Sequence, residues 1–571
     1  MRVVEPGRTS QLDPGLRAQV QSWLAEDPDR VTRAELSDLV AAAEGESEAA
    51  TVAHAELVDR FSGTLQFGTA GLRGALAAGP NRMNRVVVIR AAAGLAAYVT
   101  AHQGRSVVVG YDARYNSDVF ARDTCSVMVG AGLRAMLLPR PLPTPVLAFA
   151  IRHLGADAGV MVTASHNPPQ DNGYKVYLGD GSQIVPPTDA EISAAIDAVG
   201  PLAGIPRPNA GWVTLGEETV DAYVKRAARV PSPGTPRELR IVYTPLHGVG
   251  RDVVLQAFSR AGFAAPVVVG EQAKPDPDFP TVSFPNPEEP GAIDLAITLA
   301  KQTSADLVVA NDPDADRCAA AAPFATGWRM LSGDELGALL ATHIITRDTA
   351  VTGTFACSIV SSSLLGKIAA AHGLAYEETL TGFKWIARVP GLRFGYEEAI
   401  GYCVDPDGVR DKDGVTAALL MAELTASLRS QRRSVGDLLD DIARRYGLHA
   451  TDQLAIRVAD LALIQEGMRR LRTAPPSTLG GRKVDRVDDL TAGVGGLPPT
   501  DGLRYFLAGG SRVVVRPSGT EPKLKCYLEV VEDVEGGDVE QAPARAATAL
   551  AAIKNDLASA LALAPTANGG A

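Results

Sequence analysis

The sequence predicts an α/β fold in which one α/β unit occurs three times and is followed by a smaller α+β domain. In three places an apolar strand leads into a polar loop and then into a helical pattern, at 106–129, 239–261 and 350–372. Alternating strands and helices favour mostly parallel sheets with helices on both faces. At 571 residues the chain is too long for one hydrophobic core, so three or four domains are expected.

Each repeat is expected to open with a strand, at 106–111, 239–243 and 350–355. The predicted helices that follow cover 117–129, 252–261 and 359–372, and further strands are expected at 134–138, 266–269 and 306–310. An amphipathic helical region at 415–446 closes the third repeat. The last part of the chain has a different pattern: strands at 453–458, 511–515 and 525–531, and a helix at 461–471.

Linker composition places the domain limits. Residues 230–236 are rich in proline and glycine, which predicts a boundary near 235, and a second boundary is expected before the strand that starts near 350. Residues 472–500 are poorly patterned, and the last residues, 565–571, are expected to fray. The predicted domains are therefore 1–235, with a helical N-terminal extension, 236–347, 348–450 and 451–571.

Composition excludes several classes of protein. The net charge is −11 and no basic run or basic face stands out, which argues against nucleic-acid binding. An anionic substrate stays possible, because charges are screened beyond about 8 Å and only the local pocket matters. The five cysteines are widely spread without a CxxC pair, so neither a disulfide framework nor a thiolate zinc site is expected. A polar N-terminus and the lack of a long apolar stretch predict no membrane association and a cytoplasmic location.

A first polar loop follows the apolar run 158–162. Ser165 is its first small nucleophile, and the Asn-Pro-Pro that follows fixes a loop. Open α/β sheets place their chemistry at the carboxyl ends of strands. A serine needs assistance as a nucleophile; His166 is expected to be a poor base because successive side chains diverge, whereas Lys175 could fold back. Read alone, the motif favours a simple turn in which Ser165 and Asn167 hydrogen-bond to the backbone.

A second loop places three aspartates at alternate positions. Asp312, Asp314 and Asp316 directly follow the apolar run 307–310, and alternate residues of an extended chain face the same side. Two carboxylates about 4 Å apart repel by roughly 4 kcal/mol at an effective dielectric near 20, so a cation is expected. Oxygen ligands favour Mg²⁺ or Ca²⁺, and the spacing excludes an EF-hand. The alternative is a solvated acidic turn, against which Pro313 and the preceding strand argue.

Two further loops carry polar groups. Glu397 and Glu398 lie between glycines and could accept hydrogen bonds from vicinal sugar hydroxyls, although surface glutamates after a turn are common. The segment 516–523 follows a strand and combines Arg516, Ser518, Gly519, Thr520 and Lys523. Cationic side chains, hydroxyls and exposed backbone N–H groups suit a phosphate. The alternative is a hairpin with an ordinary basic rim.

Together these loops resemble the α-D-phosphohexomutase superfamily, over about 64–531. The resemblance is greatest to its phosphoglucomutase/phosphomannomutase members of the phosphopentomutase-related branch. Thr163-Ala-Ser165-His-Asn-Pro is similar to the phosphoserine loop, Asp312-Pro-Asp-Ala-Asp-Arg317 to the metal loop, 395–402 to the sugar loop and 516–522 to the phosphate loop. Further matches are Gly68-Thr-Ala-Gly-Leu-Arg73-Gly, Thr381-Gly-Phe-Lys384-Trp385 and Lys412-Asp-Gly414.

The resemblance implies three similar α/β mixed-sheet domains and a smaller C-terminal α+β domain around a central cleft. It implies a mutase that interconverts glucose 1-phosphate and glucose 6-phosphate through phosphorylated Ser165 and glucose 1,6-bisphosphate. Phosphomannomutase and phosphopentomutase are alternatives with the same mechanism. A metal-dependent phosphatase and a noncatalytic sugar-phosphate-binding protein are the rivals, and a monomer or weak homodimer is expected.

The resemblance also assigns roles to residues. Mg²⁺ is expected on Asp312, Asp314, Asp316 and an oxygen of phosphorylated Ser165. Catalysis is assigned to Ser165, Lys175, Arg73 and His166, with Lys175 favoured as the proton carrier. Substrate binding is assigned to Arg317, Lys384, Glu397, Glu398, Lys412, Arg516, Ser518, Gly519, Thr520 and Lys523.

Two positions depart from the pattern. Ala315 replaces a glycine common in the metal loop, and it is expected to fit if its φ is negative. Ala399 replaces the serine of many phosphoglucomutases, so it cannot supply a hydroxyl, and the preferred sugar stays open among glucose, mannose, ribose and deoxyribose.

Overall fold

The computed structural model describes residues 12–45, 47–458, 461–518, 523–534 and 539–561. The chain forms two compact units. The first consists of 1–233, 237–320 and 405–419; the second consists of 234–236, 321–404 and 420–571. Within the described residues, no helix combines the length and apolar character needed to cross a bilayer.

The predicted threefold repeat is confirmed by strand order. In each of three sheets the first strand lies between the second and the third and runs parallel to both. A fourth strand follows beside the third. The fourth strand is antiparallel in the first and third sheets. The central strands are β2 (Ser106–Tyr111), β7 (Ile241–Thr244) and β12 (Thr354–Ser358).

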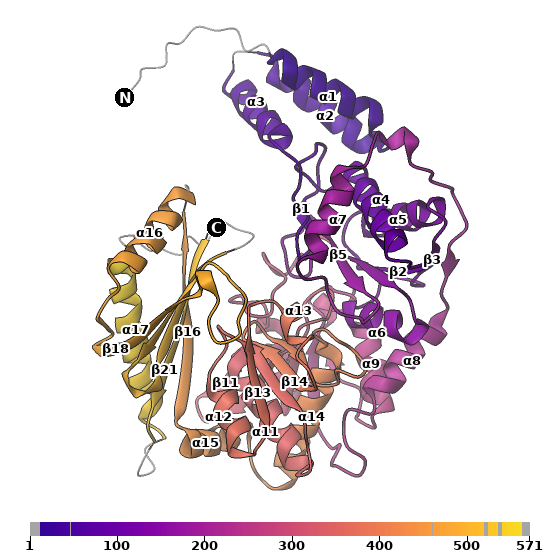
Figure 1. The fold of residues 1–571 in the computed structure, drawn as a ribbon. Helices are drawn as coiled ribbons and strands as arrows, with labels where there is room; N and C mark the ends of the chain where they lie inside the picture. Colours follow the sequence, from indigo (N-terminus) through magenta and orange to yellow (C-terminus); the bar gives the residue numbers. More distant parts are fainter. Residues whose placement is uncertain (1–11, 46, 459–460, 519–522, 535–538, 562–571) are drawn as a thin grey trace. The chain divides into compact units, whose positions relative to one another are not determined.

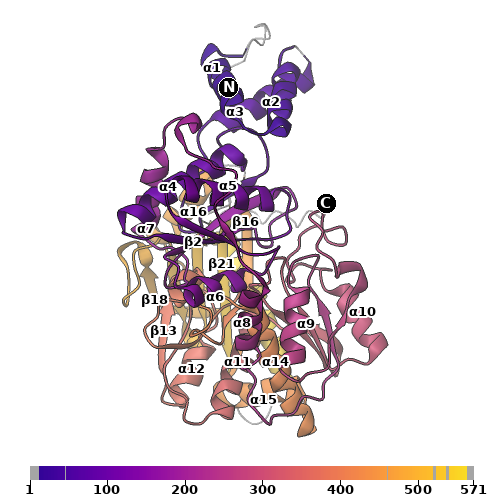
Figure 2. The same cartoon turned by 90° about the vertical axis from the view of Figure 1, so that its right-hand side faces the viewer.

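The first sheet has the order β1-β5-β4-β2-β3-β6. Its other strands are β1 (Leu72–Ala75), β3 (Arg134–Leu137), β4 (Ala158–Val162), β5 (Asp171–Leu178) and β6 (Val213–Thr214). Helices α4 (Arg85–Ala101) and α5 (Ser117–Gly130) lie on one side of β2 and α6 (Thr144–Leu154) on the other (Figures 1 and 2). Helices α7 (Thr188–Asp197) and α8 (Glu217–Ala227) complete this domain.

A helical extension precedes the first sheet, as predicted. It comprises α1 (Pro14–Glu26), α2 (Arg30–Ala43) and α3 (Glu48–Phe61). Each begins at an Asp or Ser whose side chain accepts backbone N–H groups of the first turn. Trp23, Leu36 and Leu57 are buried in the same apolar cluster as β2 and β4.

The second sheet has the order β11-β10-β9-β7-β8 and the third β13-β12-β14-β15. The second contains β8 (Val267–Val268), β9 (Leu307–Ala310), β10 (Ala319–Phe324) and β11 (Gly327–Met330), with helices α9 (Arg251–Arg260), α10 (Asp294–Thr303) and α11 (Gly333–Arg347) in the same stretch of chain. The third contains β13 (Ala375–Thr379), β14 (Leu392–Glu397) and β15 (Gly401–Cys403), with α12 (Leu364–Ala371) and α13 (Phe383–Ile386).

The predicted helical region at 415–446 is two helices, α14 (Gly414–Ser430) and α15 (Val435–Tyr446). The prediction of one amphipathic helical region was wrong for two reasons. Helix α14 is buried on nearly all sides, and α15 is a separate helix that begins at a capping box on Ser434. The segment 405–419, which includes the start of α14, belongs to the first unit.

The fourth sheet is antiparallel throughout, with the order β16-β21-β20-β19-β18-β17. Its strands are β16 (Leu448–Arg457), β17 (Thr478–Leu479), β18 (Arg482–Asp489), β19 (Leu503–Leu507), β20 (Arg512–Pro517) and β21 (Lys523–Glu532). Helices α16 (Leu461–Thr473) and α17 (Ala542–Leu561) pack on it (Figure 1). The poorly patterned stretch 472–500 supplies β17 and β18, and α17 was not predicted. The expected fraying at 565–571 lies outside the described residues.

The prediction of three similar mixed-sheet domains and a smaller fourth domain is confirmed; the central cleft stays a prediction. The repeat places three loops at equivalent positions, between the third and fourth strands: β4–β5, β9–β10 and β14–β15. These loops carry Ser165, the three aspartates and Glu398. Each contains a non-glycine residue in the left-handed region, Ser165, Ala315 or Ile400, with φ of 52°, 52° and 53°. The same site in the repeat therefore makes a sharp polar bend three times.

Candidate active site

Ser165 lies buried at the bend after β4, 3% exposed. Its backbone N–H donates to Thr163 Oγ1 at 2.9 Å, and its hydroxyl donates to Asp312 Oδ2 at 2.6 Å. The two residues are 147 positions apart, and both belong to the first unit. The structure thus brings the predicted nucleophile to the predicted metal loop.

His166 contacts its neighbour, contrary to the expectation that successive side chains would diverge. Its Nδ1 lies 3.2 Å from Ser165 Oγ. The expectation was wrong because Ser165 is in the left-handed region, which turns the two side chains to one side of the bend. Burial, then the charges of Arg317 and Arg73, lower the pKa of His166 well below its ordinary value. The imidazole is therefore neutral at pH 7.

Arg114 holds the backbone of the Ser165 loop and was missed by sequence reasoning. Its buried guanidinium donates to the carbonyl oxygens of Ser165 at 2.7 Å and Asn167 at 2.5 Å, and also to those of Pro168 and Asp171. Only Arg among the cationic side chains offers enough donors in a planar fork for such a set. A signal existed, since Asp112-Ala-Arg114 directly follows the first strand of the repeat.

The metal loop is braced from two sides. Thr144, at the start of α6, donates its hydroxyl to Asp314 Oδ2 at 2.6 Å. The backbone N–H of Val249 donates to the Pro313 carbonyl at 2.8 Å. Gly248 makes this approach possible, because a Cβ there would lie 2.3 Å from Pro313 Cα. These contacts fix the loop against α6 and the loop after β7.

Ala315 does not meet the condition on which its fit to the loop was predicted. Its φ is +52°, not negative, and its side chain is fully buried. The backbone is strained for a residue with a Cβ, at a cost of roughly 1–2 kcal/mol. A hydrogen bond from the Ala315 N–H to the Asp312 carbonyl, 2.8 Å long, helps to hold this bend.

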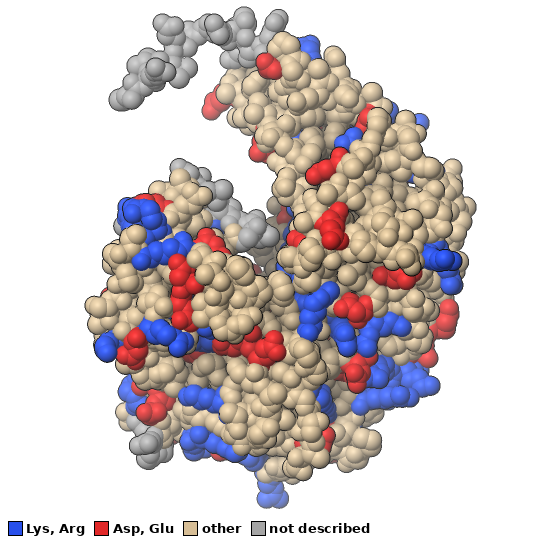
Figure 3. All heavy atoms as spheres, in the orientation of Figure 1, with Lys and Arg blue, Asp and Glu red and all other residues tan. Residues whose placement is uncertain are grey.

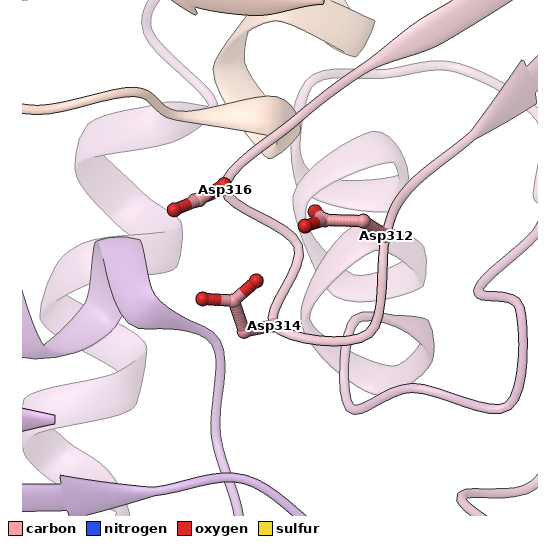
Figure 4. Close-up of side chains that lie close together, drawn as sticks. All are labelled: Asp312, Asp314 and Asp316. Atoms are coloured by element: carbon pink, nitrogen blue, oxygen red, sulfur yellow. The ribbon is translucent and has the colours of Figure 1, made fainter. Parts of the chain in front are cut away.

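The side chains of the three aspartates lie close together at one bend of the chain (Figure 4). All are fully buried, and one carboxylate oxygen of each lies within 4.8 Å of the others. The Oδ1 atoms of Asp314 and Asp316 have no hydrogen-bond partner among the described residues. Burial raises the pKa of Asp312 well above its ordinary value, and the charges of Asp314 and Asp316 raise it further. Three buried carboxylates, two of which have an oxygen without a hydrogen-bond partner among the described residues, suit a hard divalent cation such as Mg²⁺.

Three cationic side chains, those of Lys175, Arg317 and Lys412, surround the aspartates. Lys175 Nζ lies 2.8 Å from Asp314 Oδ2 and 3.0 Å from Asp316 Oδ2. Arg317 Nε lies 3.9 Å from both Asp312 and Asp316. Burial would lower the pKa of Lys175, but Asp314 and Asp316 outweigh it and raise the pKa. Lys175 is therefore a cation at neutral pH.

Lys412 reaches the same group from the segment 405–413. Its Nζ lies 3.2 Å from Asp316 Oδ2. The neighbouring Asp411 accepts hydrogen bonds from Tyr177 and Gln183, both at 2.8 Å. Asp405 pairs with Arg226 at 2.5 Å. The segment is thus fastened to other parts of the first unit at two residues that precede Lys412.

Arg73 is tied to the Ser165 loop rather than to the aspartates. It lies on β1, and its Nη1 donates to Asn167 Oδ1 at 3.0 Å. Burial lowers the pKa of its guanidinium. The first unit therefore brings together the three aspartates and six further residues predicted from sequence: Arg73, Ser165, His166, Lys175, Arg317 and Lys412.

In the second unit the predicted sugar loop is firmly held. Glu397 Oε1 accepts the backbone N–H of Gly382 at 2.7 Å, and Lys384 follows on α13. Glu398 Oε2 accepts hydroxyls of Ser358 and Ser361 at 3.1 and 3.0 Å. Burial, then the charges of Glu397 and Asp334, raise the pKa of Glu398 to about 7.

The predicted phosphate loop joins β20 and β21. Arg516 lies near the end of β20, and Ser518 donates its N–H to the carbonyl of Lys523 at 2.8 Å. Arg516 also hydrogen-bonds to Tyr527, on which the charges of Glu398 and Glu397 act. The sugar and phosphate loops are therefore neighbours within the second unit. Gly519 and Thr520 lie outside the described residues.

Family comparisons match nearly the whole chain in four consecutive parts. Models of phosphoglucomutase/phosphomannomutase α/β/α domains I, II and III match 64–201, 221–323 and 332–446, and the model of the C-terminal domain matches 456–546. A probable phosphomannomutase of Haemophilus influenzae is 48% identical over 469 residues, which cover 81% of this chain and 94% of the relative. The chain belongs to the phosphoglucomutase/phosphomannomutase family.

Other relatives of this mutase carry different names. The human phosphopentomutase is 35% identical, with 93% of this chain and 94% of the relative covered. The human glucose 1,6-bisphosphate synthase is 33% identical, with 92% of both chains covered. Family membership thus establishes an α-D-phosphohexomutase without selecting one sugar.

Solved structures agree with this fold. A putative phosphomannomutase from Thermus thermophilus matches with a TM-score of 0.65 and 25% identity, covering 85% of this mutase and 99% of that chain. Parafusin, a phosphoglucomutase from Paramecium, has a TM-score of 0.66 at 18% identity, with 87% and 95% covered, and bears on the fold alone.

Proposed function

We propose that this mutase interconverts glucose 1-phosphate and glucose 6-phosphate through phosphorylated Ser165 and glucose 1,6-bisphosphate. The observation that carries the proposal is the 2.6 Å contact between Ser165 Oγ and Asp312 Oδ2. It supports a serine that carries a phosphoryl group beside a cation site. The other substrate elements, a pair of glutamates and a basic loop, are neighbours in the second unit.

Asp312, Asp314 and Asp316, with an oxygen on Ser165, would hold Mg²⁺. When bound, the cation would neutralise the carboxylates and draw charge from the phosphoryl group. Arg73, Lys175 and Arg317 add positive charge at the same place, and Lys412 approaches Asp316 from the segment 405–413. Such fixed positive charges favour phosphoryl transfer because they stabilise the negative charge on the equatorial oxygens of the phosphoryl group.

Transfer breaks the bond between phosphorus and Ser165 Oγ and forms one between phosphorus and a sugar hydroxyl oxygen. The proton that the sugar hydroxyl loses balances the one that the released Ser165 Oγ takes up. In the return step Ser165 Oγ becomes the nucleophile again and must give up its own proton. The Ser165 hydroxyl donates to Asp312 Oδ2 at 2.6 Å, and the neutral His166, whose Nδ1 lies 3.2 Å from Ser165 Oγ, is a second acceptor within reach of this proton. Lys175 is held protonated by two aspartates and suits charge stabilisation better than proton abstraction.

Substrate recognition is assigned to the second unit. Arg516, Ser518 and Lys523, with Gly519 and Thr520, would bind the substrate's phosphate as charge-assisted donors. Glu397 and Glu398 would accept its hydroxyls, with Lys384 as a further donor. Lys412, also assigned to substrate binding, belongs to the first unit. The hydroxyl at the opposite end of the sugar would then be the one that receives the phosphoryl group from Ser165.

Mannose phosphate is the second candidate substrate, because the 48% identical relative is named a probable phosphomannomutase. Pentose phosphates are a further alternative, supported by the 35% identical phosphopentomutase. Initial rates on glucose, mannose and ribose 1-phosphates, with glucose 1,6-bisphosphate and Mg²⁺ present, decide among them. The proposal predicts the highest kcat/KM on glucose 1-phosphate. Release of inorganic phosphate in place of isomerisation would overturn it in favour of a phosphatase.

A further inference from the structure

The loop between β12 and α12 contacts the sugar loop through a serine. Ser361 Oγ donates to Glu398 Oε2 at 3.0 Å and accepts the Glu398 backbone N–H at 3.0 Å. Ser358 Oγ donates to the same carboxylate oxygen at 3.1 Å. Both serines are fully buried. Ser361 therefore fixes the carboxylate and the backbone of Glu398 together.

The same loop is bound on its other side by the C-terminal sheet. Arg512, 5% exposed, donates to the carbonyl oxygen of Ser361. It also donates to Glu378 at 2.8 Å and to Glu529 at 2.6 Å. Glu529 in turn accepts the Ser362 hydroxyl at 2.6 Å and the Ser363 N–H at 2.8 Å. Arg512 thus joins the loop 359–363, called the serine loop below, to β13 and β21.

Arg512 is the first residue of β20, and Arg516 lies four residues further along the same strand. Alternate side chains of a strand share a face, so both arginines lie on one face of β20. A parallel apolar link accompanies the ionic one, since Ile359, Val360 and Leu380 are buried against Val514 of β20 and Leu490. The strand that carries the phosphate-binding arginine is therefore locked to the loop that holds Glu398.

We propose that Ser361 and Arg512 set the distance between Glu398 and Arg516, and through it decide which sugar phosphate the mutase accepts. The inference rests on the proposed function, in which these two groups bind opposite parts of one substrate. A hexose and a pentose phosphate differ in the span from phosphate to ring hydroxyls. A rigid spacing matches one of them, and discrimination follows because the other leaves buried polar groups unpaired. Ser361 and Arg512 act through Glu398 and Arg516 and are positioning residues.

The test variants are Arg512→Lys and Ser361→Ala. Lysine keeps the charge but cannot donate in a fork to three acceptors. Arg504→Lys is the matched control, since Arg504 donates to the same Glu378 at 2.8 Å from the neighbouring strand β19. Its side chain is 8% exposed, against 7% for Arg512. A structural effect alone should therefore appear equally in both arginine variants.

Kinetics on glucose 1-phosphate and ribose 1-phosphate, with thermal unfolding in parallel, provide the readout. Arg512→Lys and Ser361→Ala should raise KM for the preferred substrate about tenfold while kcat changes less than about threefold. The ratio of kcat/KM between the two sugars should fall about fivefold or more. Arg504→Lys should keep KM and the ratio near the wild-type values.

Two results distinguish failure of the spacing inference from failure of the proposed function. Unchanged KM and ratio in both test variants, or equal changes in Arg512→Lys and Arg504→Lys, would overturn the spacing inference and leave the proposed function intact. Absence of turnover of any sugar phosphate by the wild-type protein would overturn the proposed function, and this inference with it. If Arg512→Lys does not fold, Ser361→Ala, which removes one oxygen atom, carries the comparison.

Discussion

At the scale of single residues, the chemistry depends on side chains held by buried polar contacts. Ser165, Asp312 and His166 meet because the chain bends in the left-handed region at Ser165. Sequence spacing could identify the serine and the aspartates as candidates, but it could not give this φ angle. For that reason the expected divergence of Ser165 and His166 was wrong, and the negative φ on which the fit of Ala315 was made conditional is not found.

Arg114→Lys should reduce kcat at least tenfold, equivalent to about 1.4 kcal/mol of transition-state stabilisation. Lysine cannot hold four carbonyls at once, so the Ser165 loop should lose its position while the charge is kept. Steady-state kinetics and urea unfolding measure the two effects. Arg122→Lys, at an exposed ion pair with Asp118, is the control and should change neither. Wild-type kcat in Arg114→Lys would show that the clamp is dispensable.

Glu398 should make substrate binding depend on pH. Its pKa of about 7 means that the ionised form, which accepts sugar hydroxyls, becomes dominant as pH rises through 7, so KM should fall there. The free energy of unfolding should fall as pH rises through the same range, while substrate binding improves. The folded pKa lies above the ordinary 4.5, so this group's stabilisation is full below pH 4.5 and is lost as pH rises through about 7. Glu398→Gln should flatten both profiles; an unchanged KM profile in this variant would contradict the assignment.

At the scale of elements, the repeat explains where the sites lie. The strand–loop–helix pattern predicted three equivalent units, and the strand orders confirm them. Strands near apolar runs were predicted well because burial on both faces gives continuous hydrophobic segments. The amphipathic reading of 415–446 failed because tertiary burial, which single-residue patterns do not report, surrounds α14. The segment 405–419 joins the first unit, and no local signal marks that crossing.

Two glycines set the approach of neighbouring elements to the loops. A Cβ at Gly248 would lie 2.3 Å from Pro313 Cα, and one at Gly333 would lie 1.7 Å from the Glu398 carbonyl oxygen. Gly248→Ala should therefore weaken Mg²⁺ binding, and Gly333→Ala should raise KM for the sugar phosphate, each with about 1–3 kcal/mol of destabilisation. Calorimetric Mg²⁺ titration and kinetics separate the two. Gly270→Ala, with open space around its Cβ, is the control. Identical effects of the first two variants would refute separate roles for the loops.

At the scale of the whole molecule, the chemistry divides between two compact units. The proposed phosphoserine and metal loops belong to the first, and the proposed sugar and phosphate loops to the second. On the face drawn in Figure 3, acidic and basic side chains are interspersed. The sequence predicted all four loops, three of them from the apolar strand that each follows and the sugar loop from its paired glutamates. It did not predict the hydrogen bonds and ion pairs that join β20 to the serine loop, because the residues that form them are scattered from Ser361 to Glu529.

Mg²⁺ should stabilise the first unit selectively. Binding to the native state alone stabilises it by about 2.7 kcal/mol at a hundredfold excess over Kd, and the buried aspartates give the ion a site in the first unit only among the described residues. Calorimetric unfolding with and without Mg²⁺ should show one transition moved to higher temperature. Asp314→Asn should reduce that shift. A uniform shift that survives in Asp314→Asn would place the ion elsewhere.

The most direct test of the account is the mass of the intact protein after incubation with glucose 1,6-bisphosphate and Mg²⁺. The wild type should gain one phosphoryl group, peptide mapping should place it on Ser165, and transfer to glucose 1-phosphate should remove it. Ser165→Ala should gain nothing and lose mutase activity. Full turnover by Ser165→Ala, or a wild type that isomerises sugar phosphates without ever carrying phosphate on Ser165, would contradict the central claim.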